Sequence, residues 1–254
     1  MNLFNTKVAC MARKGGVPMS ASYLGVTSVT SKIIWIAYYI VDRVSNELFL
    51  VFRMLLFEIE KVVEVSLEYL EEWGGREVMK DPRFELVVGD AYAWLLNCED
   101  KFDCVIMDIS DPIEAGPGIM LYTKELYEHV VTVLTPNGVF VTQAGNADAV
   151  PMPHANAGAR DTTCFGPIRN TLNEVYSCVL PYSMSIPSFG CDWGYVMAFN
   201  NASGDAADEW KLMSSESIDK LIEEYISGGE ASFKMYDGIT HRRMFSLTKG
   251  KATR

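Results

Sequence analysis

The sequence contains no apolar run long enough to span a membrane. Its most apolar stretch, residues 33–57, carries four charged residues, and the longest part without one covers only 33–41. A spanning helix needs roughly 20 apolar residues, and each charge at the bilayer centre would cost about 2.5–3.5 kcal/mol. A buried helix followed by a strand over 48–57 is therefore favoured over a membrane helix. No apolar core of a secretory signal follows Arg13 and Lys14.

Basic residues are also scarce. The 254 residues include 22 Lys and Arg against 33 Asp and Glu, which gives a net charge of −11. Nucleic-acid surfaces need an excess of Lys and Arg to neutralise phosphates. The charge balance therefore argues against a nucleic-acid partner and is compatible with a cationic small molecule.

The cysteines lack the short paired spacing of zinc and redox motifs. All six stand well apart, and several lie inside apolar runs. Buried free thiols are typical of a reducing compartment. This pattern predicts a cytoplasmic protein.

Strand and helix patterns alternate along the chain from residue 48 onward. Short apolar runs at 48–57, 83–88, 103–107 and 139–142 predict strands, and helical spacing predicts helices at 62–70, 91–96 and 124–134. The Pro136-Asn137-Gly138 turn precedes the last of these strands. Short links between alternating elements predict an α/β fold, a doubly wound and mostly parallel sheet.

Acidic residues stand at the ends of three predicted strands. Glu58 follows the first, Asp90 the second and Asp108 the third. In a doubly wound sheet these ends line one edge, over which a nucleoside can lie. The alternative is that the three acids are solvated loop residues.

Asp108 and Asp111 form a pair in the loop Asp108-Ile109-Ser110-Asp111-Pro112. Two carboxylates three residues apart, just past a buried strand, would make an anionic pocket for a cationic substrate. The alternative is an ordinary turn, since Asp side chains bond nearby amides and Pro fixes φ.

Several ordered blocks resemble the polyamine aminopropyltransferases, the spermidine and spermine synthase family, and within it most the thermospermine synthases. The blocks lie at 58–63, 81–91, 102–112, 121–124, 138–145, 186–189, 192–198 and 236–238. The resemblance implies a Rossmann-like sheet of the class I methyltransferase type. It divides the chain into an atypical segment 1–54, a transferase domain 55–245 and a tail 246–254.

The resemblance also implies a reaction. Family members transfer an aminopropyl group from decarboxylated S-adenosylmethionine, a co-substrate, to a polyamine and release methylthioadenosine. The reacting carbon is already activated by the sulfonium, so neither a metal nor a cofactor is expected. Asp108 matches the catalytic aspartate that accepts the amine proton, and Asp111 would hold the amine or the donor's ammonium group.

Five further positions carry over from the family. Glu58 matches the residue that binds the donor ribose, and Asp90 with Ala91 matches the adenine site. Gln143 aligns with a glutamine near the acceptor pocket, and the alternative is that it satisfies loop amides. Phe189 stands where spermidine synthases carry a tyrosine, which favours spermidine, giving thermospermine, over putrescine as acceptor.

The amino-terminal part departs from the family pattern. The family's β-hairpin and glycine-rich turn are not recognisable, because Gly15-Gly16 has no strand before it and is followed by Val17-Pro18. The chain is expected to be truncated or altered at its start. Two hypotheses stay open, an active transferase and a non-catalytic homologue acting only as a subunit, and a methyltransferase is a weaker third. The resemblance implies a homodimer or homotetramer.

Overall fold

The computed structural model of the protein describes eleven segments of the chain. Two expectations fall outside them, the buried helix before residue 48 and Glu58, as does most of the predicted helix 62–70. The described residues are 8–12, 52–56, 67–69, 75–80, 84–109, 111–112, 118–148, 163–200, 211–226, 229–233 and 235–247.

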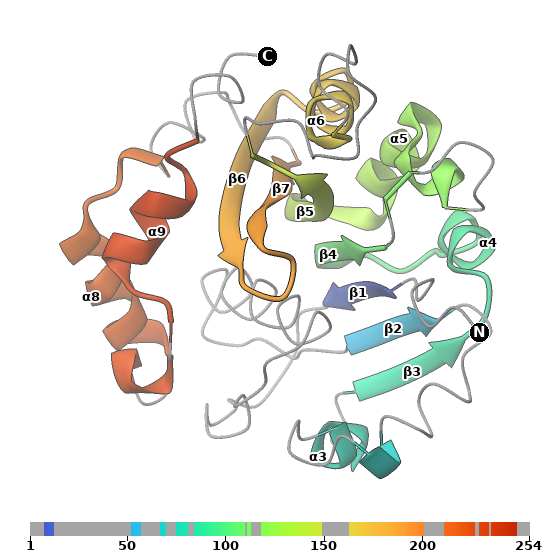
Figure 1. The fold of residues 1–254 in the computed structure, drawn as a ribbon. Coiled ribbons are helices and arrows are strands. Elements are labelled where there is room, and N and C mark those ends of the chain that lie inside the picture. Colours follow the sequence, from blue (N-terminus) through green and yellow to red (C-terminus); the bar gives the residue numbers. More distant parts are fainter. Residues whose placement is uncertain are drawn as a thin grey trace.

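Seven strands in these segments form a single mixed sheet (Figure 1). Its order is β3-β2-β1-β4-β5-β7-β6. The strands are β1 (Val8–Ala12), β2 (Phe52–Leu56), β3 (Phe84–Val88), β4 (Phe102–Asp108), β5 (Leu134–Asn146), β6 (Cys178–Ile186) and β7 (Cys191–Phe199). Five of them run in one direction, and only β1 and β7 are reversed. The predicted mostly parallel α/β sheet is therefore confirmed.

Strand β1 was not predicted, and it lies inside the sheet, between β2 and β4. It pairs antiparallel with both β2 and β4, so that Val8 lies beside Leu56 and Asp108, and Ala12 lies beside Cys104. The start of β1, not its end, therefore lies at the edge where β2 and β4 finish.

Helices cover both faces of the sheet (Figure 1). One layer contains α4 (Ala91–Leu96), α5 (Lys124–Val133) and α6 (Phe165–Asn173), and the other contains α8 (Ser215–Tyr225) and α9 (Gly238–Met244). Three shorter elements complete the described structure, α3 (Gly75–Lys80), η3 (Ile119–Tyr122) and η4 (Gly229–Ser232).

Side-chain alternation along β4 divides the core into two parts. Val105 and Met107 lie in the cluster on the α4–α5–α6 side, whereas Cys104 and Ile106 lie in the cluster that includes Ile218 of α8. Because successive strand residues point to opposite faces, one apolar strand supplies both cores. The residue that follows in this alternation, Asp108, ends the strand.

Buried tyrosines are prominent in both parts of the core. Burial is the largest cause that raises the pKa of each hydroxyl well above its ordinary value of 10. We call this set the five buried tyrosines: Tyr122, Tyr127, Tyr176, Tyr182 and Tyr195.

Capping side chains explain where four of the helices begin. The Asp90 carboxylate accepts hydrogen bonds at the start of α4, and Thr123, Ser214 and Asp237 do the same for α5, α8 and α9. Each cap satisfies a backbone N–H that has no partner within its helix. The predicted helix 91–96 is confirmed at both ends, and 124–134 is one residue shorter than predicted.

Strand β5 is much longer than predicted. The expected turn at Pro136-Asn137-Gly138 lies inside it, because β5 extends from Leu134 to Asn146. Phe102 pairs with Leu134 and Cys104 with Val139, so five steps along β5 match two steps along β4. A register shift thus absorbs three residues that the sequence pattern assigns to a turn.

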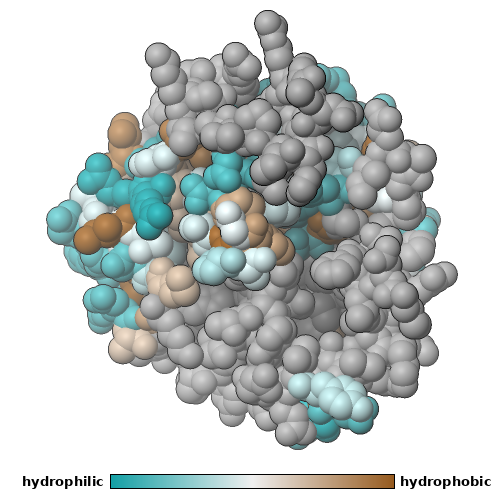
Figure 2. All heavy atoms as spheres, viewed as in Figure 1, coloured by the Kyte–Doolittle hydropathy of each residue, from teal (hydrophilic) through white to brown (hydrophobic). Residues whose placement is uncertain are grey.

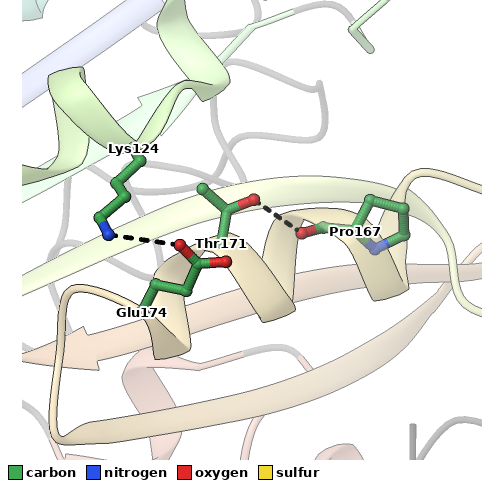
Figure 3. Close-up of polar contacts among 4 residues, drawn as sticks. All are labelled: Lys124, Pro167, Thr171 and Glu174. Carbon is green, nitrogen blue, oxygen red and sulfur yellow. Dashed lines mark hydrogen bonds and ion pairs between the residues drawn. The ribbon is translucent and has the colours of Figure 1, made fainter.

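Helices α5 and α6 also meet at the surface (Figure 3). Lys124 Nζ lies 3.4 Å from Glu174 Oε2, and the Thr171 hydroxyl donates to the Pro167 carbonyl at 3.0 Å. Both charged side chains are exposed, so the ion pair contributes only about 0–1 kcal/mol.

The outer surface of the α8–α9 layer is mainly hydrophilic, with scattered apolar residues (Figure 2). Leu212, Met235 and Ile239 are exposed apolar side chains in this part of the chain. Single exposed apolar residues are ordinary on folded proteins. Within the segments that the structure describes, no helix has the length and apolarity to cross a membrane.

Candidate functional site

The predicted site residues lie along the edge at which the parallel strands end, but they are spread along it, because Asp90 and Phe189 follow the two outermost strands, β3 and β6. Asp108 ends β4, and Asp90 follows β3 by two residues. The β6–β7 hairpin turn that carries Phe189 lies at the same edge, because Ile186 pairs with Cys191. Gln143, on β5, pairs with Tyr195 of β7. It comes one residue after Thr142, which pairs with Met107 near the end of β4. Glu58 and Ser110 lie outside the described residues.

Gln143 makes several hydrogen bonds in this region. It is 3% exposed, and its Nε2 donates to the Ile109 carbonyl at 2.6 Å, to Asp111 Oδ1 at 3.1 Å and to the Tyr122 hydroxyl at 2.6 Å. Its Oε1 accepts from the backbone N–H of Gly145 at 2.8 Å. Gln143 thus satisfies backbone groups of Ile109 and Gly145 and also contacts the Asp111 carboxylate, while its place in an acceptor pocket stays a prediction.

The second donor to Gln143 Oε1 is Trp193, which was not among the predicted site residues. Trp193 Nε1 donates to Gln143 Oε1 at 3.1 Å. The Trp193 ring also packs on Phe189, with ring centroids 4.4 Å apart. The signal for Trp193 was its position in the block 192–198, four residues after Phe189, but only the fold directs its N–H toward Gln143.

Asp111 lies against the backbone of Gly145. A Cβ placed on Gly145 would come within 3.3 Å and 3.4 Å of the two carboxylate oxygens of Asp111, and within 2.6 Å of Cys164 Sγ. Gly145 has a φ of 72°, a left-handed conformation that glycine adopts readily. The backbone of Gly145 therefore bounds the Asp111 carboxylate on one side.

Two buried tyrosine hydroxyls lie near the aspartates. Asp108 contributes to the raised pKa of Tyr195, after burial as the main cause. Asp111 contributes to the raised pKa of Tyr122, behind burial and the neighbouring Tyr127 and Cys164, while the Gln143 hydrogen bond lowers it. Both tyrosines consequently remain neutral hydrogen-bonding groups next to the carboxylates at physiological pH.

Three carboxylates, those of Asp111, Asp148 and Asp192, form a negative region around Cys191. Burial, followed by Asp148, Asp192 and Asp111, raises the pKa of the Cys191 thiol. The backbone N–H of Asp192 donates to Asp148 Oδ1 at 3.3 Å, which joins the loop after β5 to the start of β7. This edge of the sheet thus opposes negative charge on a thiol and attracts cations.

Asp90 has a structural role in addition to its predicted binding role. Its Oδ1 accepts from the backbone N–H groups of Tyr92 at 2.9 Å and Ala93 at 3.2 Å, and the side chain is exposed. Ala91, the other predicted donor-site residue, is buried as the first residue of α4. Any test of donor binding at Asp90 must therefore keep the helix cap.

Comparisons with known proteins point to a single family. Residues 50–205 match the family model described as the spermine/spermidine synthase domain. The chain is 37% identical over 188 residues to polyamine aminopropyltransferase 2 of Hyperthermus butylicus, which covers 74% of this chain and 55% of that protein. It is 38% identical over 147 residues to a thermospermine synthase of Arabidopsis thaliana, covering 58% of this chain and 38% of that protein.

Solved structures show the same fold. The spermidine synthase of Thermotoga maritima superposes with a TM-score of 0.52 at 20% identity, covering 76% of this chain and 57% of that one. A spermidine synthase in complex with the transition-state analogue AdoDATO gives a TM-score of 0.51 at 19% identity, covering 76% and 56%. The chain thus spans little more than half the length of the first curated relatives and of these structures.

Proposed function

The chain belongs to the spermine/spermidine synthase family, and from this we propose that it transfers an aminopropyl group from decarboxylated S-adenosylmethionine to a polyamine. The observation that carries the proposal is the Asp108–Asp111 loop at the carboxyl end of β4, with Asp111 bonded to the buried Gln143. Methylthioadenosine is the second product.

Asp108 is the proposed proton acceptor. The amine nitrogen attacks the methylene carbon beside the sulfonium, a C–N bond forms, and the C–S bond breaks with its electron pair moving to sulfur. An alkylamine has a pKa near about 10, as for Lys, and is almost fully protonated at neutral pH. Asp108 orients the amine and accepts its proton, and positioning contributes much of the rate.

Asp111 is the proposed cation-binding residue. Its carboxylate binds the acceptor amine or the donor's aminopropyl ammonium by a charge-assisted hydrogen bond. Asp148 and Asp192 lie in the same negative region around Cys191 and favour a substrate with several positive charges. Glu58, Asp90 and Ala91 are the proposed contacts of the donor nucleoside.

Spermidine is the proposed acceptor and thermospermine the product. Phe189 lacks the hydroxyl that spermidine synthases place beside their acceptor, and its ring packs with that of Trp193. This aromatic pair offers an apolar surface to the methylene chain of a longer amine. Putrescine is the alternative acceptor.

A non-catalytic homologue, acting only as a subunit, is the second candidate. One observation favours it: β1 runs antiparallel between β2 and β4, inside the sheet. The last residue of β1 lies beside Cys104, at the opposite end of β4 from Asp108. We further propose a cytoplasmic homodimer or homotetramer.

One assay separates these candidates. The purified chain is incubated with decarboxylated S-adenosylmethionine and with spermidine or putrescine, and the products are identified by chromatography. Methylthioadenosine with thermospermine supports the main proposal, and methylthioadenosine with spermidine formed from putrescine supports the alternative acceptor. The absence of methylthioadenosine with both amines would leave only the non-catalytic homologue.

A further inference from the structure

The side-chain amide of Gln143 can adopt only one orientation. Both partners of its Oε1, the backbone N–H of Gly145 and the indole N–H of Trp193, are donors with no accepting capacity. The Oε1 position must therefore be the oxygen, and the NH₂ group must face Asp111 Oδ1 and the Ile109 carbonyl. An opposite orientation would place an acceptor against a carboxylate.

We propose that Trp193 and Gln143 are positioning residues that act in series on Asp111. Trp193 fixes the Gln143 amide, and the amide holds the Asp111 carboxylate in the orientation that binds the cationic substrate. This inference rests on the proposed function, because it concerns the residues that orient Asp111, the proposed cation-binding residue. Neither residue needs to touch the substrate for this role.

The arrangement explains why an indole, rather than another aromatic ring, suits position 193. Phenylalanine at this position keeps the ring packing with Phe189 but removes the only N–H that a tryptophan side chain provides. Among the described residues, the Gln143 oxygen would then keep a single donor, the backbone N–H of Gly145. The buried amide would lose one of the two bonds that set its orientation, and with it part of the constraint on Asp111.

Trp193 comes from a strand that carries none of the other members of this network. It stands on β7, where it pairs with Asn146 beyond a register shift between Gln143 and Asn146 on β5. The shift interrupts the regular alternation of β5 at the point where the chain passes Asp111. The β6–β7 hairpin is therefore coupled to the carboxylate through a side chain rather than through backbone pairing.

Calorimetric binding to the full chain tests the proposal. The probes are spermidine, decarboxylated S-adenosylmethionine and methylthioadenosine, which has no ammonium group and so does not depend on Asp111. For Trp193→Phe we expect about threefold to tenfold weaker binding of the cation that Asp111 holds, and for Gln143→Leu about tenfold or more. Methylthioadenosine should bind both variants as it binds the wild type.

The matched control is Trp94→Phe, the same substitution in a tryptophan of α4 that packs near Phe102. It should leave all three affinities unchanged. The double variant Trp193→Phe/Gln143→Leu should bind no more weakly than Gln143→Leu alone, since the two residues act in series. Additive losses would show that Trp193 acts independently of Gln143 and would overturn the proposal.

Two failures can be distinguished. If the wild type binds both cations and releases methylthioadenosine, but Trp193→Phe binds them equally well, only the positioning inference fails. It also fails if methylthioadenosine binding falls in parallel, because that result indicates general loss of structure. If the wild type binds neither cation and releases no methylthioadenosine, the proposed function fails and the inference falls with it.

Discussion

Gly145→Ala is the substitution whose consequences the site geometry defines most sharply. The residue combines a left-handed φ of 72° with close approach to Cys164 and Asp111. A methyl group here therefore meets two penalties, one from the backbone and one from its neighbours. It should both destabilise the fold and disturb the carboxylate.

The two penalties can be estimated separately. A left-handed conformation costs a non-glycine residue about 1–2 kcal/mol. The new Cβ would lie 2.6 Å from Cys164 Sγ, closer than atoms tolerate, and overpacking of this kind costs about 1–3 kcal/mol. The free energy of unfolding should thus fall by about 2–5 kcal/mol in total.

Gly190→Ala is the matched control. Gly190 has a similar φ of 66°, but a Cβ there would meet no atom of the described residues within 4 Å. Denaturant unfolding of the two variants should therefore show a loss of about 1–2 kcal/mol for Gly190→Ala. The difference between the variants isolates the contacts with Cys164 and Asp111.

A second variant tests which contact is responsible. Cys164→Ala should recover part of the stability lost in Gly145→Ala, because it removes the sulfur atom nearest the new methyl group. Equal losses in Gly145→Ala and Gly190→Ala would refute the reasoning, since the close approach at Gly145 would then carry no energetic cost.

Three other predictions concern the donor site, the acceptor and pH. Asp90→Asn should weaken the binding of decarboxylated S-adenosylmethionine while keeping the helix cap. Asp90→Ala should also lower the free energy of unfolding by about 1 kcal/mol, because it removes the cap. Unchanged donor affinity in Asp90→Asn, measured by calorimetry, would contradict a binding role. Phe189→Tyr should raise kcat/KM for putrescine relative to spermidine by about twofold to tenfold, and an unchanged ratio in steady-state assays would remove Phe189 from acceptor choice. The five buried tyrosines have folded-state pKa values above the unfolded value of about 10. The free energy of unfolding should therefore keep its full value below that pH. Above it, the free energy of unfolding should fall by about 1.4 kcal/mol per pH unit for each tyrosine. Tyrosinate absorbance that rises at the same pH in folded and urea-unfolded protein would exclude this effect.

Local patterns in the sequence were sufficient for the elements that carry Asp90 and Asp108. Strands β3 and β4 and helix α4 are short apolar or helical segments with clear boundaries, and a carboxylate at Asp90 marks the start of α4. These features depend on neighbours within a few residues. The sequence contains that information directly.

Non-local pairing explains what the sequence did not reveal. Strand β1 has no periodic pattern, and it joins the sheet only through partners more than 40 residues away on β2 and β4. Turn residues at Pro136-Asn137-Gly138 lie within β5 because a register shift accommodates them. In both places tertiary pairing outweighs local preference.

The same distinction applies to the site. The positions of Asp90 and Asp108 at an edge of the sheet could be predicted, because each comes at the end of a strand. The contact of Trp193 could not, because it is a hydrogen bond to Gln143, 50 residues earlier in the chain. Side-chain networks across strands leave no spacing in the sequence.

The most direct test of the central claim is methylthioadenosine release by the wild type and by Asp108→Asn, with spermidine as acceptor. Asparagine is nearly the same size but cannot accept the amine proton, so the account predicts at least about a hundredfold loss of turnover with an unchanged unfolding transition. Turnover at the wild-type rate in Asp108→Asn would contradict it.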